Sequence, residues 1–252
     1  MRKTIPGAIA TLLGATVFAS AADVTYERLR NPEPRNWLHH HGDYNAHRYS
    51  PLTIINKTNA GKLRMAFAVA LGGSAGNENL TATPLVDDGY MFITDAWGVL
   101  YKIDVRTGTS GPIVWKMDPS QQKIDRNRGA ALWGNLAISM TSHDGRVVAT
   151  NKDTGQIVWD KNLRDQPDMT LNSAPLALEN AIIIGASGGD QGVRNWVAAL
   201  DPKTGNEIWR TYSVPKPGEP GAETWKDKNN AWETGGGAFY VTGSYDPATN
   251  TT

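Results

Sequence analysis

Short apolar runs rich in β-branched residues, each bounded by a glycine-containing turn, form the most regular pattern along this chain. Residues 146–150 follow the turn Asp144-Gly145, and residues 90–94 follow a turn at 87–89. The apolar run at 181–185 has the length of a buried strand rather than of a helix. Such runs between Asp-Gly turns are typical of β-hairpins. The pattern therefore predicts an all-β protein.

One polar turn recurs three times, each time followed by an apolar run that ends in a tryptophan. The turns and their tryptophans are Thr107-Gly108 with Trp115, Thr154-Gly155 with Trp159, and Thr204-Gly205 with Trp209. The three threonines are 47 and 50 residues apart. A period of this length, with about four strands in each unit, is typical of the blades of a β-propeller.

The recurring tryptophans are interpreted as packing residues. A buried tryptophan removes roughly 200 Å² from water, and its indole N–H then needs a hydrogen-bond acceptor. We expect each ring to lie against the neighbouring blade, where a backbone carbonyl or a threonine accepts that hydrogen bond. The glycine of each turn permits the positive φ of a tight reversal.

Charge and composition exclude several functional classes. The 252 residues include 25 basic and 25 acidic residues, so the formal net charge is zero. A nucleic-acid partner, which would require a basic surface, is therefore not expected. The 26 glycines and 14 prolines suit a turn-rich β protein. Because the chain has no cysteine, disulfides and thiol chemistry are excluded.

Residues 1–21 are predicted to be a cleavable signal peptide. Arg2 and Lys3 precede an apolar stretch at residues 5–18, and Ala19-Ser20-Ala21 suits cleavage by a signal peptidase. The apolar stretch is short for a membrane-spanning helix, so no membrane span is expected after cleavage. We expect export to a bacterial periplasm, with residues 22–252 forming the folded domain.

The C-terminal end predicts an incomplete ring of blades. Residues 245–247 have the sequence of a hairpin turn, and no return strand follows them. The sequence then contains about four blades, the last of them incomplete, whereas roughly four to eight blades are needed to close a propeller. We expect the chain to be the N-terminal part of a longer propeller, or the product of a truncated gene.

Motifs between the repeats resemble those of the pyrroloquinoline-quinone (PQQ) dependent methanol/ethanol dehydrogenases. The resemblance extends from Asn36 to the C-terminus and rests on Asn36-Trp37, residues 47–52, Asn127-Arg128-Gly129, and residues 187–194, 217–225 and 235–237. It implies an eight-bladed propeller with PQQ on its axis and a Ca²⁺ or lanthanide ion beside the PQQ. It also implies periplasmic oxidation of an alcohol to an aldehyde, with a cytochrome c as electron acceptor.

The resemblance also assigns individual residues to the cofactor. Arg128 matches an arginine that contacts the quinone oxygens, where a permanent planar cation can stabilise the reduced quinone. Asn172 matches a threonine that hydrogen-bonds the cofactor, and Tyr240 matches a tryptophan that stacks beneath the ring system. Ser187-Gly188-Gly189 matches a segment whose hydroxyl and N–H groups meet a PQQ carboxylate.

Asp190 stands where the family has a glutamate that binds the metal ion. Ca²⁺ is bound by carboxylate oxygens at about 2.3–2.6 Å, and aspartate supplies the same group on a side chain shorter by one methylene. Other positions depart from the family: Gln122-Lys123 replaces adjacent cysteines, and Thr81 and Ala238 replace a carboxylate and a threonine. The family's aspartate base matches no residue up to Thr252. No catalytic residue is therefore assigned, and the chain alone is expected to be inactive.

A non-catalytic propeller, acting as an envelope scaffold or binding protein, is the alternative that the repeats allow. Asn127-Arg128-Gly129 and residues 187–194 favour the enzyme, because a bare scaffold does not need them. His39-His40-His41 with His47 resembles a metal site, but consecutive strand residues alternate faces, so a metal site is not expected there. Glu219 and Glu223 lie in a loop rich in proline and glycine, and we expect them to be solvated.

Overall fold

The computed structural model describes residues 22–72, 79–226 and 229–252. The predicted signal peptide lies outside these residues. Within the described part of the chain, no helix has the length and apolar character needed to cross a membrane.

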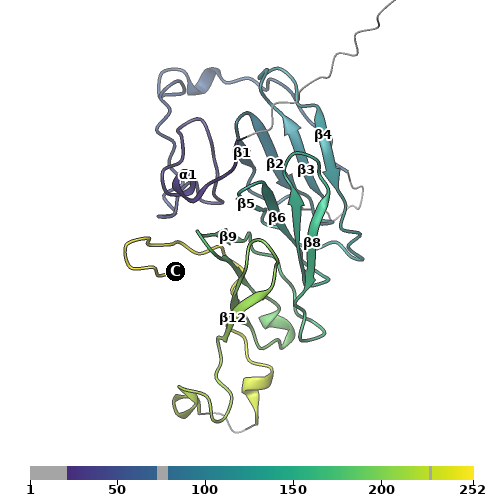
Figure 1. Cartoon of the computed structure of the whole chain (residues 1–252), viewed down its shortest axis with the longest axis vertical. Coiled ribbons are helices and arrows are strands. Elements are labelled where there is room, and N and C mark those ends of the chain that lie inside the picture. Colours follow the sequence, from purple (N-terminus) through teal and green to yellow (C-terminus); the bar gives the residue numbers. More distant parts are fainter. Residues whose placement is uncertain (1–21, 73–78, 227–228) are drawn as a thin grey trace, which may run out of the picture.

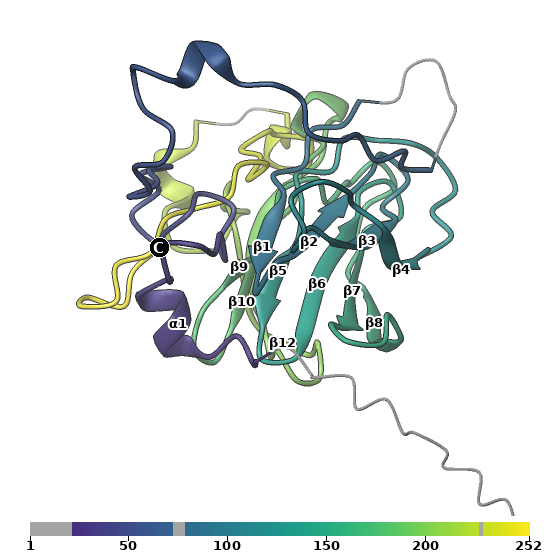
Figure 2. The same ribbon diagram turned by 90° about the horizontal axis from the view of Figure 1, so that it is seen from above.

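The described residues form three four-stranded antiparallel sheets, which lie one after another in the order of the sequence (Figures 1 and 2). The strands of the first sheet are β1 (Leu85–Asp87), β2 (Tyr90–Thr94), β3 (Leu100–Asp104) and β4 (Ile113–Met117). Those of the second are β5 (Ala131–Trp133), β6 (Leu136–Thr141), β7 (Arg146–Asn151) and β8 (Ile157–Asn162). Those of the third are β9 (Leu176–Ala177), β10 (Ile182–Gly185), β11 (Trp196–Leu200) and β12 (Glu207–Tyr212).

The helical elements are short and lie outside the sheets. They are α1 (Tyr26–Arg30) and the 3₁₀ turns Ala60–Lys62, Gly189–Gln191, Ala222–Thr224 and Ala231–Glu233. The side chain of Thr25 caps α1 by accepting a hydrogen bond from the backbone N–H of Arg28. The all-β prediction is therefore confirmed.

Each sheet is a simple meander in which every strand pairs with the next one in the sequence. A register shift recurs at the same place between the third and fourth strands, at Lys102/Ile103, Ala149/Thr150 and Ala199/Leu200. A β-bulge increases the local twist of a strand pair. The recurrence of the bulge shows that the three sheets are copies of one unit, as the spacing of the threonines predicted.

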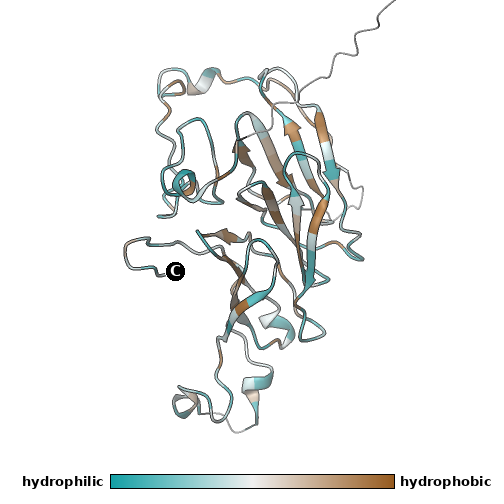
Figure 3. Ribbon diagram, viewed as in Figure 1, coloured by the Kyte–Doolittle hydropathy of each residue, from teal (hydrophilic) through white to brown (hydrophobic). Residues whose placement is uncertain are grey.

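The fourth strand of each sheet is its most exposed strand. Val147, Val148 and Ala149 in β7 of the middle sheet are fully buried, whereas β12 of the last sheet has no buried residue. Figure 3 shows the apolar residues concentrated in the inner strands. In the middle sheet, consecutive residues of β6 and β7 are buried, so both faces of these two strands are covered.

Two of the three recurring tryptophans pack across the seams between sheets, as predicted, whereas Trp209 on the last sheet is 42% exposed. The indole of Trp115 donates to the carbonyl of Lys152 at 3.2 Å, and that of Trp159 donates to the carbonyl of Pro202 at 3.0 Å. A Cβ on Gly155 would lie 2.8 Å from the Trp115 ring, so only glycine permits this contact. One expectation was wrong: the strands continue beyond the tryptophans, because the outer strand pairs along its whole length with its neighbour.

The C-terminal residues do not add a fourth sheet to the three in the described part of the chain. The turn expected at residues 245–247 forms as part of a tight loop closed by a bridge between Asp246 and Thr251. The backbone N–H of Tyr245 donates to the carbonyl of Tyr44 at 2.9 Å. The loop is thus attached to the N-terminal segment rather than to a further blade.

The N-terminal segment is attached to the first two sheets by a buried ion pair. Asp87 and Lys152 are both fully buried, and the ammonium of Lys152 lies 2.5 Å from the carboxylate of Asp87. Arg28 adds a second cation to this carboxylate at 2.9 Å. A buried charge without a partner is costly, so these charges require one another. The contacts of Asp87 with Arg28 and Lys152 fix α1 beside β1, as Figure 1 shows.

The seam contacts predict unequal costs for two tryptophan substitutions. Trp159 is 8% exposed in its seam, whereas Trp209 is 42% exposed on the last sheet. Trp159→Ala should lower the free energy of unfolding by about 3–5 kcal/mol because it leaves a cavity. Trp209→Ala should lower it by less than about 1 kcal/mol. Urea denaturation followed by circular dichroism measures both, and equal losses would contradict the seam account.

Candidate functional site

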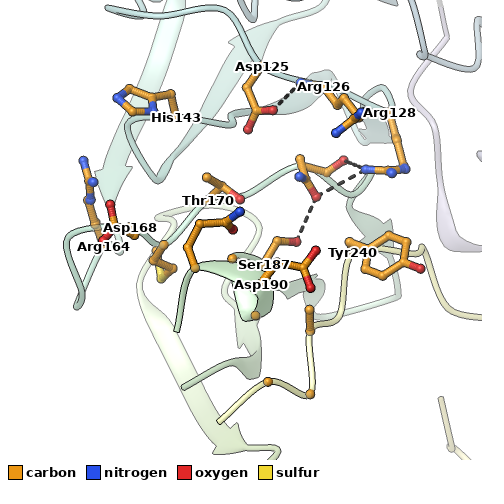
Figure 4. Close-up of a pocket in the computed structure, with 18 residues that line it drawn as sticks. Asp125, Arg126, Arg128, His143, Arg164, Asp168, Thr170, Ser187, Asp190 and Tyr240 are labelled. Atoms are coloured by element: carbon orange, nitrogen blue, oxygen red, sulfur yellow. Dashed lines mark hydrogen bonds between the residues drawn. The ribbon is translucent and has the colours of Figure 1, made fainter. Parts of the chain in front are cut away.

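A cavity of about 690 Å³ lies at the edge of the second and third sheets (Figure 4). Every residue predicted from the resemblance lines it: Arg128, Asn172, Ser187, Gly188, Gly189, Asp190 and Tyr240. The structure therefore brings the predicted residues together, although they come from four separate segments of the chain. Their roles in binding remain predictions.

The meander explains why these segments meet. In such a sheet, the chain enters the first strand at the same edge at which it leaves the second. Arg128 lies just before β5 and Asn172 lies in the loop before β9, while Ser187 and Asp190 follow the end of β10. Tyr240 is delivered by the C-terminal segment, where the N–H of Phe239 donates to the carbonyl of Ala186 at 2.9 Å.

Asn127 holds the loop that carries Arg128. Its side chain is 2% exposed, donates to the carbonyl of Met140 at 2.8 Å, and accepts from the hydroxyl of Thr94 at 2.7 Å. It also accepts from the N–H of Gly129 at 3.0 Å, and Gly129 has a φ of 126°. Asn127 therefore has a structural role in its motif, and Arg128 is the residue that faces the cavity.

Arg128, Asn172 and Ser187 form a hydrogen-bonded row along one wall of the cavity, drawn as dashed lines in Figure 4. Arg128 donates to the backbone carbonyl of Asn172 at 2.8 Å and to its side-chain oxygen at 3.2 Å. The hydroxyl of Ser187 donates to the same side-chain oxygen at 2.8 Å. Burial, followed by the nearby Arg126, lowers the pKa of Arg128 from its ordinary value. An arginine remains charged all the same.

The exposed ring of Tyr240 lies beside this row. The guanidinium carbon of Arg128 is 5.2 Å from the centre of the ring, which is within the range of a cation–π contact. Because Tyr240 is 49% exposed, the ring is available to a flat ligand. Arg128 and Tyr240 together form one end of the cavity.

Backbone geometry explains the glycine at position 188. Gly188 has a φ of 108°, and a Cβ there would lie 2.6 Å from the carbonyl of Asp168. The backbone of Ser187 pairs with Thr170, donating at 2.8 Å and accepting at 3.1 Å. The glycine thus lets the chain turn sharply after this bridge and begin the 3₁₀ turn that carries Asp190.

Asp190 is exposed at the cavity. In the part of the chain that the structure describes, no group of three His, Cys, Asp or Glu side chains is arranged to hold a metal ion. Asp190 can therefore supply one carboxylate ligand to a metal ion, but it does not form a complete site with its neighbours. A Ca²⁺ ion takes six to eight oxygen ligands.

The cavity is also lined by polar side chains that the sequence did not single out: Asp125 and Arg126 near Arg128, and His143, Arg164 and Asp168 towards the opposite end. They lie in the hairpin between β6 and β7 and in the loops before β5 and β9. In the sequence these segments are ordinary polar turns, and only the meander brings them to the same edge as Arg128.

The loop after β12 is fixed by Arg194, and one expectation about this loop was wrong. Glu219 is not simply solvated, because its carboxylate accepts from the guanidinium of Arg194 at 2.6 Å. Arg194 is 7% exposed, lies 3.9 Å from the centre of the Tyr212 ring, and also donates to the carbonyl of Val214. The backbone N–H of Lys216 and the charge of Arg194 lower the pKa of Glu219.

Comparisons with known proteins place the chain among quinoprotein dehydrogenases. The profile of the PQQ glucose/ethanol/alcohol dehydrogenase β-propeller domain matches residues 37–252. The dehydrogenase subunit of a quinone alcohol dehydrogenase from Gluconacetobacter polyoxogenes is 34% identical over 94% of this chain and 36% of that protein. The quinoprotein alcohol dehydrogenase PedH of Pseudomonas putida is 32% identical over 96% of this chain and 44% of that protein.

Solved structures give the same result. The quinohemoprotein alcohol dehydrogenase ADHIIG of Pseudomonas putida superposes with a TM-score of 0.81 at 32% identity, over 92% of this chain and 36% of that one. A europium-containing methanol dehydrogenase superposes with a TM-score of 0.78 at 30% identity, over 88% of this chain and 42% of that one. The chain thus spans less than half the length of each of these relatives.

The bonding of Asn127 leads to a prediction about the site loop. Asn127→Ala removes three buried hydrogen bonds and leaves the carbonyl of Met140 without this donor. The free energy of unfolding should fall by about 2–3 kcal/mol, because an unsatisfied buried polar group is costly. Chemical denaturation measures the loss. The exposed Gln122→Ala is the matched control and should change stability by less than about 0.5 kcal/mol. A loss at Asn127 no larger than in this control would contradict the assigned role.

Proposed function

The chain belongs to the family of PQQ-containing glucose/ethanol/alcohol dehydrogenase β-propellers, and from this premise we propose that its cavity contributes to a PQQ site for the oxidation of alcohols to aldehydes. One observation carries the proposal. The residues that sequence resemblance assigns to PQQ come from four segments, and all of them line a single cavity. This proposal extends to a periplasmic location after removal of residues 1–21, and to a cytochrome c as electron acceptor.

The cavity fits the cofactor in size and chemistry. Its volume of about 690 Å³ lies in the usual range of roughly 300–1,000 Å³ for small-molecule sites. PQQ is a flat tricyclic quinone that carries carboxylates, so it needs a ring to stack on and donors for its oxygens. Tyr240 offers the ring, Arg128 a guanidinium, and residues 187–189 a hydroxyl and backbone N–H groups.

The residues of this chain have separate tasks. Bound PQQ supplies the chemistry of the reaction, because it accepts the hydride that leaves the alcohol carbon. Arg128 directs positive charge towards the quinone oxygens and favours the more anionic reduced form. Asn172 orients Arg128 through the two hydrogen bonds at 2.8 and 3.2 Å, and also accepts from Ser187. The two glycines would hold a carboxylate at close range through their backbone N–H groups. The Ser187 hydroxyl has one proton, so it would join them by turning from Asn172 to the carboxylate.

Asp190 is the proposed ligand to a Ca²⁺ or lanthanide ion. Both are hard cations that prefer carboxylate oxygens. The described residues contain no group of three His, Cys, Asp or Glu side chains that could hold the ion by itself. The proposal therefore includes PQQ and further oxygen-bearing groups among the ligands. The general base of alcohol oxidation is likewise proposed to lie in blades that this chain does not contain.

We propose that this chain is part of a longer, complete propeller, and the activity is tested on that propeller. After reconstitution with PQQ and Ca²⁺ or La³⁺, it should reduce an artificial electron acceptor when a primary alcohol is added. The 252-residue chain alone, treated identically, should not reduce the acceptor. Absence of alcohol-dependent reduction by the complete, PQQ-loaded propeller would exclude the dehydrogenase and favour a scaffold.

The proposed role of Arg128 can be tested by PQQ affinity. Arg128→Lys keeps the charge but loses the planar donor geometry. We expect PQQ binding to the complete propeller to weaken about 10- to 100-fold, the equivalent of one hydrogen bond to a charged group. The exposed His47→Gln is the control and should leave the affinity unchanged. Titration of the protein fluorescence with PQQ provides the measurement, and an unchanged affinity in Arg128→Lys would remove Arg128 from the site.

A further inference from the structure

Three consecutive buried histidines lie behind the cavity wall. His39, His40 and His41 are 5%, 8% and 9% exposed. The ring of His39 faces α1, with its Nε2 2.7 Å from the carbonyl of Leu29. The other two rings face the site loops, and Arg48 reaches them from an exposed loop. We refer to His40, His41 and Arg48 as the histidine–arginine cluster.

Hydrogen bonding determines which ring nitrogens carry protons. Arg48 donates from Nε to Nδ1 of His41 at 3.1 Å, and its Nη2 lies 3.3 Å from Nε2 of His40. A guanidinium can only donate, so both of these ring nitrogens must be unprotonated acceptors. His41 therefore carries its proton on Nε2, from which it donates to the carbonyl of Thr242 at 2.9 Å. Both rings are neutral in this arrangement.

The cluster connects the segments that form the cavity. Thr242 is two residues from Tyr240, and its hydroxyl donates to the carbonyl of Ala174 at 2.8 Å. It also accepts from the N–H of Ala174 at 3.2 Å, which joins it to the loop that carries Asn172. On the other side, the backbone of Arg128 is close enough to the His40 ring to act on it electrostatically. The Nδ1 of His40, which carries the proton in this arrangement, has no hydrogen-bond partner among the described residues.

We propose that the histidine–arginine cluster positions Arg128 and the segment of Tyr240 against each other while both imidazoles are neutral, and that protonation of His40 releases them. A proton on the Nε2 of His40 would face the guanidinium of Arg48, which has no lone pair to accept it. The contact between His40 and Arg48 would then become a repulsion. The inference rests on the proposed function only in treating the cavity as a cofactor site.

The charged groups around His40 determine the direction of the pH dependence. Burial is the main cause that lowers the pKa of His40; together with the nearby His41, Arg48 and Arg128 side chains, and against the opposing effect of the Arg128 backbone, it brings this pKa to about 4. Burial also lowers the pKa of His39, while Asp43 opposes that effect. Burial raises the pKa of Tyr245 on the C-terminal segment, so this residue is neutral in the same range. Because the folded pKa of His40 lies below the ordinary value, the cluster is intact at neutral pH. It is lost as the pH falls towards 4.

Nuclear magnetic resonance of the ¹⁵N-labelled 252-residue chain tests the proposal without any cofactor. At neutral pH, His41 should carry its proton on Nε2. On titration to about pH 4, the amides of Arg128, Gly129 and Thr242 should shift with the same midpoint as the ring of His40. A His41 proton on Nδ1, or protonation of His40 without movement of these amides, would overturn the proposal.

Two variants separate positioning from general stability. His40→Gln should abolish the coupled shift of the three amides, because glutamine does not titrate. His47→Gln should leave it intact, since His47 is exposed and paired with Asp43 at 3.1 Å. The same titration of the amides in His40→Gln as in the parent chain would contradict the proposal. If His40→Gln does not fold, the titration of the parent chain still decides. If the complete propeller does not bind PQQ, the proposed function is wrong, but the outcome of these titrations still decides the role of His40.

Discussion

Face-to-face packing of four-stranded sheets is the interaction on which the rest of this structure depends. Trp115 and Trp159 each cover a glycine turn of the next sheet and donate to a carbonyl there. These contacts fix the position of each sheet relative to the next. As a result, the loops that enter the first strand of each sheet lie at the same edge of the structure. The cavity exists because these edges meet, and its residues can therefore come from loops far apart in the sequence.

The fold was predictable because its determinants are local and repeated. Thr-Gly turns, β-branched runs and one tryptophan per unit specify strands and seams without knowledge of distant contacts. The sequence did not reveal the short strand β5, the bulge between the third and fourth strands, or the end of each outer strand. These depend on pairing with a neighbouring strand, and such context is absent from a local pattern.

The site was predictable only in part, for a different reason. Motif resemblance assigned the residues that face the cavity, and the structure brings them together. It did not show what holds them there. Asn127 supports the Arg128 loop, and Arg194 fixes Glu219 and the loop after β12. The histidine triplet carries no repeated spacing, and its partners Leu29, Arg48 and Thr242 are distant or irregular in sequence. Long-range contacts of this kind become visible only once the chain is folded.

The central claim, that this cavity contributes to a PQQ site, is tested most directly by a crystal structure of the complete propeller with PQQ and La³⁺. We predict electron density for PQQ against the Tyr240 ring, with its oxygens beside Arg128 and Ser187. An anomalous peak should lie within about 2.3–2.6 Å of the Asp190 carboxylate, the distance range of a hard cation. PQQ bound elsewhere, or a metal ion with no contact to Asp190, would contradict the account.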